Sequence, residues 1–136
     1  MGPSAASVLV FLIEDNLLIR ANLVAALVEL ASVQIVGEVA SEREAVDWLR
    51  AHPDDWQLAV VDLFLTQGSG LGVLRACRTR QAGQKAVVLS NYVTAEMRTR
   101  CTELGADAVF DKSTEVDEFL AYCKGYAAPA QSPGHP

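Results

Sequence analysis

The feature that most constrains this chain is the alternation of five short apolar runs with stretches of helical length along nearly all of its 136 residues. The runs, rich in Val, Leu and Ile, predict strands at Val8–Ile13, Val33–Ala40, Leu58–Val61, Ala86–Leu89 and Ala108–Phe110. The stretches after them have helical periodicity and predict helices at Asn16–Leu30, Glu42–Ala51, Leu71–Gln81, Ala95–Leu104 and Glu115–Lys124. Because strands that are apolar on both faces need cover on both sides, the alternation predicts a doubly wound α/β fold with a parallel sheet.

Local signals support several of the predicted helix starts. Ser41 and Glu44 have the spacing of a capping box at the second helix, and Thr114 and Asp117 have the same spacing at the fifth. Thr94 stands where its hydroxyl can cap the fourth helix. These signals agree with the helix positions that periodicity predicts.

Length and composition limit the class of protein. A chain of 136 residues with 51% hydrophobic residues suits one compact domain and is too apolar for a disordered chain. The net charge of -6 opposes contact with phosphates, so direct nucleic-acid binding is not expected. The longest apolar run, Val8–Ile13, is far shorter than the roughly 20 residues of a membrane span, and the first seven residues carry no basic export signal. We therefore expect a cytoplasmic protein without membrane contact.

The three cysteines form no pattern that indicates chemistry. Their number is odd and no C-x-x-C pair is present, while each lies in a predicted helix (Cys77, Cys101 and Cys123). We expect them to be small buried side chains in a reducing cytosol.

Polar side chains follow four of the five predicted strands at the point where each strand ends. They are Glu14 and Asp15 after the first strand, Asp62 after the third, Ser90 after the fourth, and Asp111 and Lys112 after the fifth. Ligands of open α/β sheets bind at this edge, and with strand order 2-1-3-4-5 the first and third strands are neighbours. The three acids Glu14, Asp15 and Asp62 are then expected to converge.

Converging carboxylates repel one another unless a cation compensates their charge. Mg²⁺, or Mn²⁺ in its place, suits the site because it takes oxygen ligands in octahedral geometry. Other interpretations remain open for single residues: Asp15 or Asn16 can simply cap the first helix, Lys112 can be a surface lysine and Ser90 a loop hydroxyl.

Taken together, these residues resemble the response-regulator receiver domain of two-component signalling. The resemblance covers roughly Val8 to Lys124 and is carried by six short segments: Leu12–Asn16, Val60–Leu63, Gly68–Leu71, Val88–Ser90, Gly105–Asp107 and Asp111–Lys112. It implies a flavodoxin-like fold, with a five-stranded parallel sheet of order 2-1-3-4-5 and helices on both faces.

The resemblance also implies a role for each site residue. Asp62 would accept a phosphoryl group from the phosphohistidine of a sensor kinase or phosphotransfer protein. Asp15, Asp62 and the backbone carbonyl of Phe64 would bind Mg²⁺, with Glu14 assisting through water. Lys112 and Ser90 would contact the phosphoryl oxygens, and the loop after the fourth strand would report the phosphate on the face formed by the fourth helix, fifth strand and fifth helix.

The sequence departs from the family pattern at two positions. Many receivers carry a switching Tyr or Phe three residues before the lysine, but this chain has Val109, and Phe110 should point to the opposite face of the sheet. The residue after the lysine is Ser113 rather than a proline, so a trans Lys112–Ser113 bond and a cap for the fifth helix from Ser113 or Thr114 are expected.

Two bulky residues, Phe64 and Tyr92, stand at positions that commonly tune phosphoryl lifetime in the family. Side chains of this size would obstruct the in-line approach of a hydrolytic water, which predicts slow autodephosphorylation. The alternative is that both side chains turn away from the site.

We expect an N-terminal extension at 1–7, a receiver domain at 8–125 and a flexible tail at 126–136, without an output domain in this chain. Its signal would pass by phosphorylation-dependent binding to an unknown downstream protein, as a monomer or weak dimer, and it would be no enzyme beyond its own phosphorylation and dephosphorylation. Two other functions are weighed: a phosphohydrolase with an aspartyl nucleophile, which usually carries D-x-D where this chain has Phe64 as the third residue, and a receiver-like adaptor that is not phosphorylated.

Overall fold

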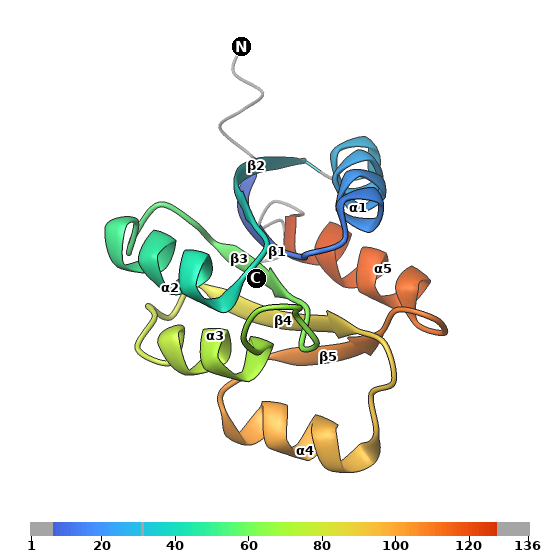
Figure 1. Ribbon diagram of the computed structural model, residues 1–136. Coiled ribbons are helices and arrows are strands. Elements are labelled where there is room, and N and C mark those ends of the chain that lie inside the picture. Colours follow the sequence, from blue (N-terminus) through green and yellow to red (C-terminus); the bar gives the residue numbers. More distant parts are fainter. Residues whose placement is uncertain (1–6, 31, 128–136) are drawn as a thin grey trace, which may run out of the picture.

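The computed structural model describes residues 7–30 and 32–127, which form a parallel five-stranded sheet with helices on both faces (Figure 1). The strands are β1 (Val8–Ile13), β2 (Val33–Val39), β3 (Leu58–Val61), β4 (Lys85–Ser90) and β5 (Ala108–Asp111). The helices are α1 (Leu17–Leu30), α2 (Glu42–Ala51), α3 (Gly70–Ala76), α4 (Ala95–Glu103) and α5 (Val116–Ala127). The sheet order β2-β1-β3-β4-β5 confirms the predicted doubly wound topology.

Two apolar layers hold the helices to the sheet. On one face, α1 and α5 pack over side chains that include Val10, Leu12 and Phe119. On the other face, α2, α3 and α4 pack over a cluster that includes Phe11 and Ile13. Neighbouring residues of β1 thus enter opposite layers, as strand geometry requires. Each fully buried side chain of this size contributes about 1.5–3 kcal/mol to stability.

The predicted α3 was too long. It ends at Ala76 rather than Gln81, and Cys77 is the residue that caps its C-terminus. The reason is tertiary: the Arg80 guanidinium donates to the carbonyls of Cys77, Gln84 and Gly105 and pairs with Asp107 at 2.7 Å. These contacts hold the chain in a turn that a continued helix would break.

The structure confirms two of the three predicted helix caps. Ser41 accepts from the Glu44 N–H at 3.1 Å and Thr94 from the Met97 N–H at 3.1 Å, which confirms the caps of α2 and α4. The expected cap of α5 was wrong: the helix begins at Val116, so neither Ser113 nor Thr114 directly precedes it. The Ser113 hydroxyl and N–H both donate to Asp111 instead.

The remaining boundaries agree with the prediction to within a few residues. Helix α5 extends through Ala127 and so includes two residues assigned to the tail, while residues 1–6 and 128–136 lie outside the described part. All three cysteine side chains are buried, as expected, and burial raises the pKa of the Cys77 thiol to about 11 and of the Cys123 thiol to about 12. Among the helices of the described residues, none has the length and apolar character needed to cross a bilayer.

Candidate functional site

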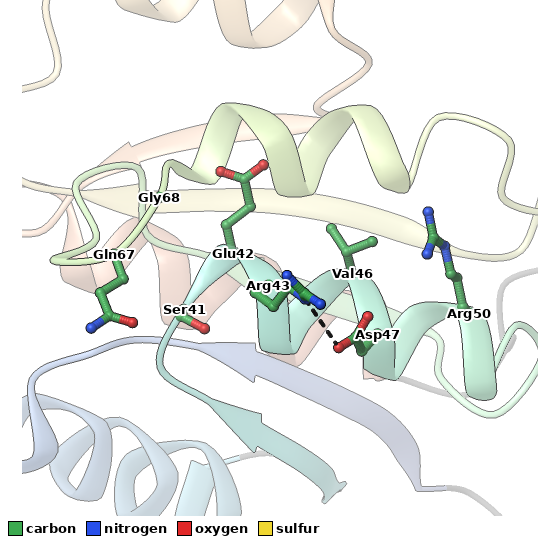
Figure 2. Close-up of a pocket in the computed structure, with 8 residues that line it drawn as sticks. All are labelled: Ser41, Glu42, Arg43, Val46, Asp47, Arg50, Gln67 and Gly68. Atoms are coloured by element: carbon green, nitrogen blue, oxygen red, sulfur yellow. Dashed lines mark ion pairs between the residues drawn. The ribbon is translucent and has the colours of Figure 1, made fainter.

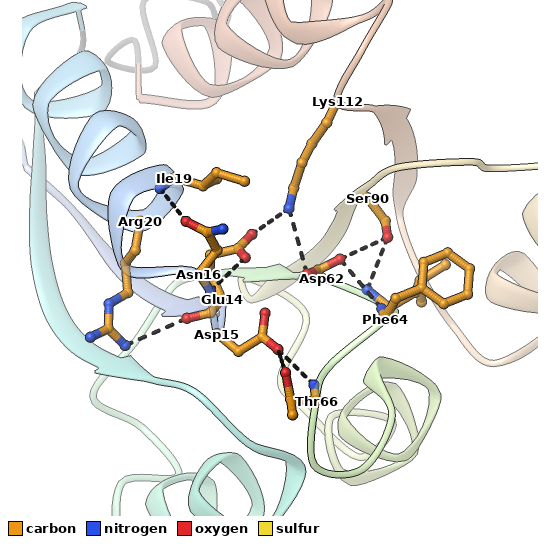
Figure 3. Close-up of polar contacts among 11 residues, drawn as sticks. Glu14, Asp15, Asn16, Ile19, Arg20, Asp62, Phe64, Thr66, Ser90 and Lys112 are labelled. Carbon is orange, nitrogen blue, oxygen red and sulfur yellow. Dashed lines mark hydrogen bonds and ion pairs between the residues drawn. The ribbon is translucent and has the colours of Figure 1, made fainter.

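The backbone ladder of the sheet continues past the strand ends and brings the predicted site residues together. The N–H of Glu14 donates to the Val39 carbonyl at 3.0 Å, and the N–H of Asp62 donates to the Ile13 carbonyl at 3.1 Å. On the other side, the N–H of Lys112 donates to the Ser90 carbonyl at 2.9 Å. The sheet itself therefore places these side chains along one edge (Figure 3).

Asp62 lies at the centre of the site and is 6% exposed. Its Oδ1 accepts a hydrogen bond from the Ser90 hydroxyl at 2.7 Å, and its Oδ2 lies 3.5 Å from the Lys112 ammonium (Figure 3). The fully buried Ser90 Oγ also accepts the Leu63 N–H at 3.2 Å. A hydroxyl and a cation thus hold the two oxygens of one carboxylate in a fixed orientation.

Glu14 is the most buried acid of the site, with 2% of its surface exposed. Its Oε1 forms an ion pair with Lys112, and its Oε2 accepts the Asn16 N–H at 3.0 Å. Burial raises the pKa of Glu14 above the ordinary value of 4.5, and the charge of Asp62 adds to the increase, against hydrogen bonds from Lys112 and Asn16. The Lys112 ammonium is therefore shared between two buried carboxylates.

Asp15 lies at the more open side of the site and is held by the loop after β3. Its Oδ2 accepts two hydrogen bonds from Thr66, one from the N–H at 2.6 Å and one from the hydroxyl at 2.5 Å. Burial opposes ionisation, but these two hydrogen bonds keep the pKa of Asp15 below its ordinary value. Asp15 is therefore a carboxylate at neutral pH.

The three acids meet the requirements of a divalent cation. One oxygen from each of Glu14, Asp15 and Asp62 lies within 4.8 Å of the others, and all the donors are carboxylate oxygens. This donor set suits Mg²⁺ or Mn²⁺, which prefer oxygen ligands. Lys112 supplies one positive charge against three negative ones, so a cation here would relieve repulsion that the protein leaves uncompensated.

A pocket of about 230 Å³ opens beside these acids. Phe64 and Tyr92 line it together with Asp62 and Lys112, but both aromatic side chains are largely exposed, at 51% and 84%. The structure therefore brings both residues to the rim of the site. Their predicted effect on the hydrolysis of a phosphoryl group stays a prediction. The N–H of Phe64 lies 3.4 Å from Asp62 Oδ1, so its backbone is close to the acid cluster.

The residues around the expected switch lie as strand alternation predicts. Val109 packs in the layer of α2, α3 and α4, whereas Phe110 packs edge-on against Phe119 of α5, with ring centres 5.9 Å apart. No peptide bond among the described residues is cis, so the Lys112–Ser113 bond is trans as predicted.

Tyr92 has a backbone conformation that the sequence did not indicate. Its φ of 56° lies in the left-handed region, which is uncommon for a bulky residue other than glycine. The next N–H, of Val93, donates to the Asp111 carboxylate at 3.4 Å. The loop after β4 is thereby tied to the end of β5.

Sequence reasoning did not find three further residues of the site and its surroundings: Thr66, Glu42 and Arg98. Thr66 binds Asp15, and Glu42 accepts the Ser69 N–H at 2.9 Å in the same loop. Arg98 joins α4 to β5 and to the start of α5 through the Val109 carbonyl and Glu115. The sequence signal that could have indicated Thr66 is its position four residues after Asp62.

Comparison with known proteins identifies the family. The family model described as response regulator receiver domain matches residues 10–124, which is most of the chain. This chain belongs to that family. The receiver domain thus defined contains all the acids of the site together with Ser90 and Lys112.

Two curated relatives are similar to this receiver domain over most of its length. Response regulator UvrY of Escherichia coli O6:H1 is 24% identical over 112 residues, which cover 82% of this chain and 50% of UvrY. The DNA-binding transcriptional activator DevR/DosR of Mycobacterium tuberculosis is 28% identical over 119 residues, covering 88% of this chain and 54% of that protein. The chain spans about half the length of these relatives.

Among solved structures, the signal receiver domain of the putative response regulator NarL from Mycobacterium tuberculosis has a TM-score of 0.71 and 25% identity. The alignment covers 88% of this chain and 98% of that one. The similarity therefore extends over an entire receiver domain.

Proposed function

We propose that this receiver domain accepts a phosphoryl group on Asp62 from a phosphohistidine of a sensor histidine kinase or phosphotransfer protein. The observation that carries the proposal is the environment of Asp62, where Ser90 contacts one carboxylate oxygen and Lys112 lies near the other. Membership of the receiver family supports the same role. The reaction forms a bond from an Asp62 oxygen to phosphorus while the P–N bond of the donor breaks and the imidazole leaves.

The side chains of the site have distinct parts in this transfer. The Lys112 ammonium neutralises charge on the phosphoryl oxygens, and Ser90 donates its hydroxyl proton to one of them. Asp15, Asp62 and the Phe64 carbonyl would hold Mg²⁺ or Mn²⁺, with Glu14 assisting through water, and the ion would supply further positive charge to the phosphoryl oxygens. Glu14 also holds the Lys112 ammonium at the site through their ion pair.

The phosphorylated domain would signal by binding a downstream protein in the cytoplasm. The relatives named above include a DNA-binding activator, but they are about twice as long as the matched region. For this domain we propose a protein partner, because the net charge of -6 opposes direct contact with nucleic acid. We expect it to act as a monomer or weak dimer and to catalyse only its own phosphorylation and dephosphorylation.

Incubation with acetyl phosphate and Mg²⁺, followed by intact-protein mass spectrometry, tests the phosphoacceptor role. The wild-type protein should gain the mass of one phosphoryl group, and Asp62→Asn should gain none. Asp55→Asn, an exposed aspartate in the turn before β3, is the matched control and should be modified like the wild type. A domain that forms no adduct under any condition would instead be a receiver-like adaptor, and steady turnover of phosphate esters would indicate a phosphohydrolase.

A further inference from the structure

The loop between β3 and α3 is fixed to the rest of the domain at two carboxylates. Midway along the loop, the N–H and hydroxyl of Thr66 both donate to the same oxygen of Asp15, at 2.6 and 2.5 Å. Towards its C-terminal end, the Ser69 N–H donates to Glu42 at 2.9 Å, and the Glu42 N–H donates to the Gln67 carbonyl at 3.1 Å. A segment of four residues therefore makes four hydrogen bonds to two acids of other elements.

Glycines allow the second of these attachments. Figure 2 shows the Glu42 side chain at the start of α2, extending toward α3 beside the loop that contains Gly68. A Cβ atom on Gly68 or on Gly72 would overlap the Glu42 side chain, and Gly68 has a φ of +92° that favours glycine. Glu42 thus lies against the backbone of both glycines, which keeps the loop, and Thr66 within it, at a defined position.

The two hydrogen bonds from Thr66 both go to one oxygen of the Asp15 carboxylate. Figure 3 shows one carboxylate oxygen of Asp15 turned to Thr66 and the other turned toward the remaining acids of the site. Because both Thr66 donors contact Oδ2, the Oδ1 atom remains for a ligand. Metal-ligating carboxylates are generally held in this way by hydrogen bonds from residues that do not touch the metal, and loss of such a partner typically weakens metal binding 10–100-fold.

We propose that Thr66 is the positioning residue that orients Asp15 for the divalent cation, with the Glu42 attachment of the loop fixing Thr66 in turn. The inference rests on the proposed metal site but assigns a role to a residue outside the ligand set. Removal of the hydroxyl leaves the N–H bond in place, so we expect an effect at the lower end of the range, about tenfold.

Mn²⁺ binding followed by the electron paramagnetic resonance signal of the free ion tests this role without any phosphorylation. Thr66→Val, which keeps the side-chain shape, should bind Mn²⁺ about tenfold more weakly than the wild type. Thr66→Ser keeps the hydroxyl and should restore affinity to within about twofold. Thr79→Val, at an exposed threonine in the turn after α3, is the matched control and should bind as the wild type does.

The exposed position of Thr66 means that none of these variants should alter folding, which thermal unfolding in a chelator checks. Equal Mn²⁺ affinity in Thr66→Val and the wild type would overturn the positioning role and leave the proposed metal site standing, provided Asp15→Asn still loses affinity. A Thr66→Ser variant as weak as Thr66→Val would also overturn it. A wild-type protein that binds no Mn²⁺ would overturn both proposals.

Discussion

Replacement of Asp62 with asparagine should stabilise the domain when divalent cations are absent. Asp62 and Glu14 are both buried. One carboxylate oxygen from each of them and one from Asp15 lie within 4.8 Å of one another. Asparagine has nearly the shape of aspartate and keeps an oxygen that can accept the Ser90 hydroxyl. The substitution therefore removes a charge while retaining the hydrogen bond that orients the side chain.

The expected gain follows from the distances in the site. The separations within the acid cluster are at most 4.8 Å, and with an effective dielectric constant of about 20 two unit charges at that limit repel by about 3.5 kcal/mol, so loss of two repulsions gains at least about 7 kcal/mol. Loss of the attraction between Asp62 and Lys112 at 3.5 Å costs about 5 kcal/mol on the same scale. The net expectation is a gain of at least about 2 kcal/mol, which corresponds to roughly 5–10 °C in Tm for a domain of this size.

Urea unfolding monitored by circular dichroism, first in a chelator and then with saturating Mg²⁺, measures this difference. The wild type should gain about 2.7 kcal/mol at a Mg²⁺ concentration of about one hundred times Kd, and Asp62→Asn should gain much less. Asp55→Asn serves again as the control for loss of an exposed aspartate. The reasoning is refuted if Asp62→Asn is no more stable than the wild type in the chelator.

Three other predictions concern the same edge of the sheet. Lys112→Met should lower the free energy of unfolding by about 3 kcal/mol, because it leaves the buried Glu14 carboxylate without its cation; a loss below about 1 kcal/mol in urea unfolding would contradict this. The raised pKa of Glu14 means that the folded state holds this proton more tightly, so wild-type stability in a chelator should fall as pH rises from 4.5 through that raised pKa. Glu14→Gln should lack this fall, and an identical pH profile in both proteins would argue against it. Substitution of Phe64 and Tyr92 by asparagine should speed loss of the phosphoryl group from Asp62, as followed by mass spectrometry over time; an unchanged or slower loss would show that neither side chain obstructs water.

The sheet and most of the acid site could be predicted from the sequence because they depend on local patterns. Apolar runs separated by helical stretches specify parallel strands, and the polar residues at their carboxyl ends then meet at one edge. The backbone hydrogen bonds from Asp62 to Ile13 and from Lys112 to Ser90 hold these residues at that edge. Strand alternation likewise sufficed to place Val109 and Phe110 in different layers.

The features that escaped prediction depend on contacts between side chains and distant backbone. Helix α3 ends early because Arg80 binds carbonyls of the following turn and of the loop before β5. The hydrophobic periodicity of the sequence does not reveal these contacts. Thr66 and Asp15 are 51 positions apart, and Ser69 and Glu42 are 27 apart. Local propensity carries no information on such pairs.

The hydrogen bonds of Ser90 constrain how the conformation of the domain would respond to a phosphoryl group on Asp62. The Ser90 hydroxyl has one proton, which it now donates to Asp62, while its oxygen accepts the Leu63 N–H. To donate to a phosphoryl oxygen, Ser90 must give up the bond to Asp62, and β4 continues from Ser90 into the loop that contains Tyr92. Because the Val93 N–H in that loop donates to the Asp111 carboxylate at the end of β5, a displacement there would reach β5 through this side chain. This connection needs no aromatic residue at position 109, so Val109 is compatible with a signalling receiver.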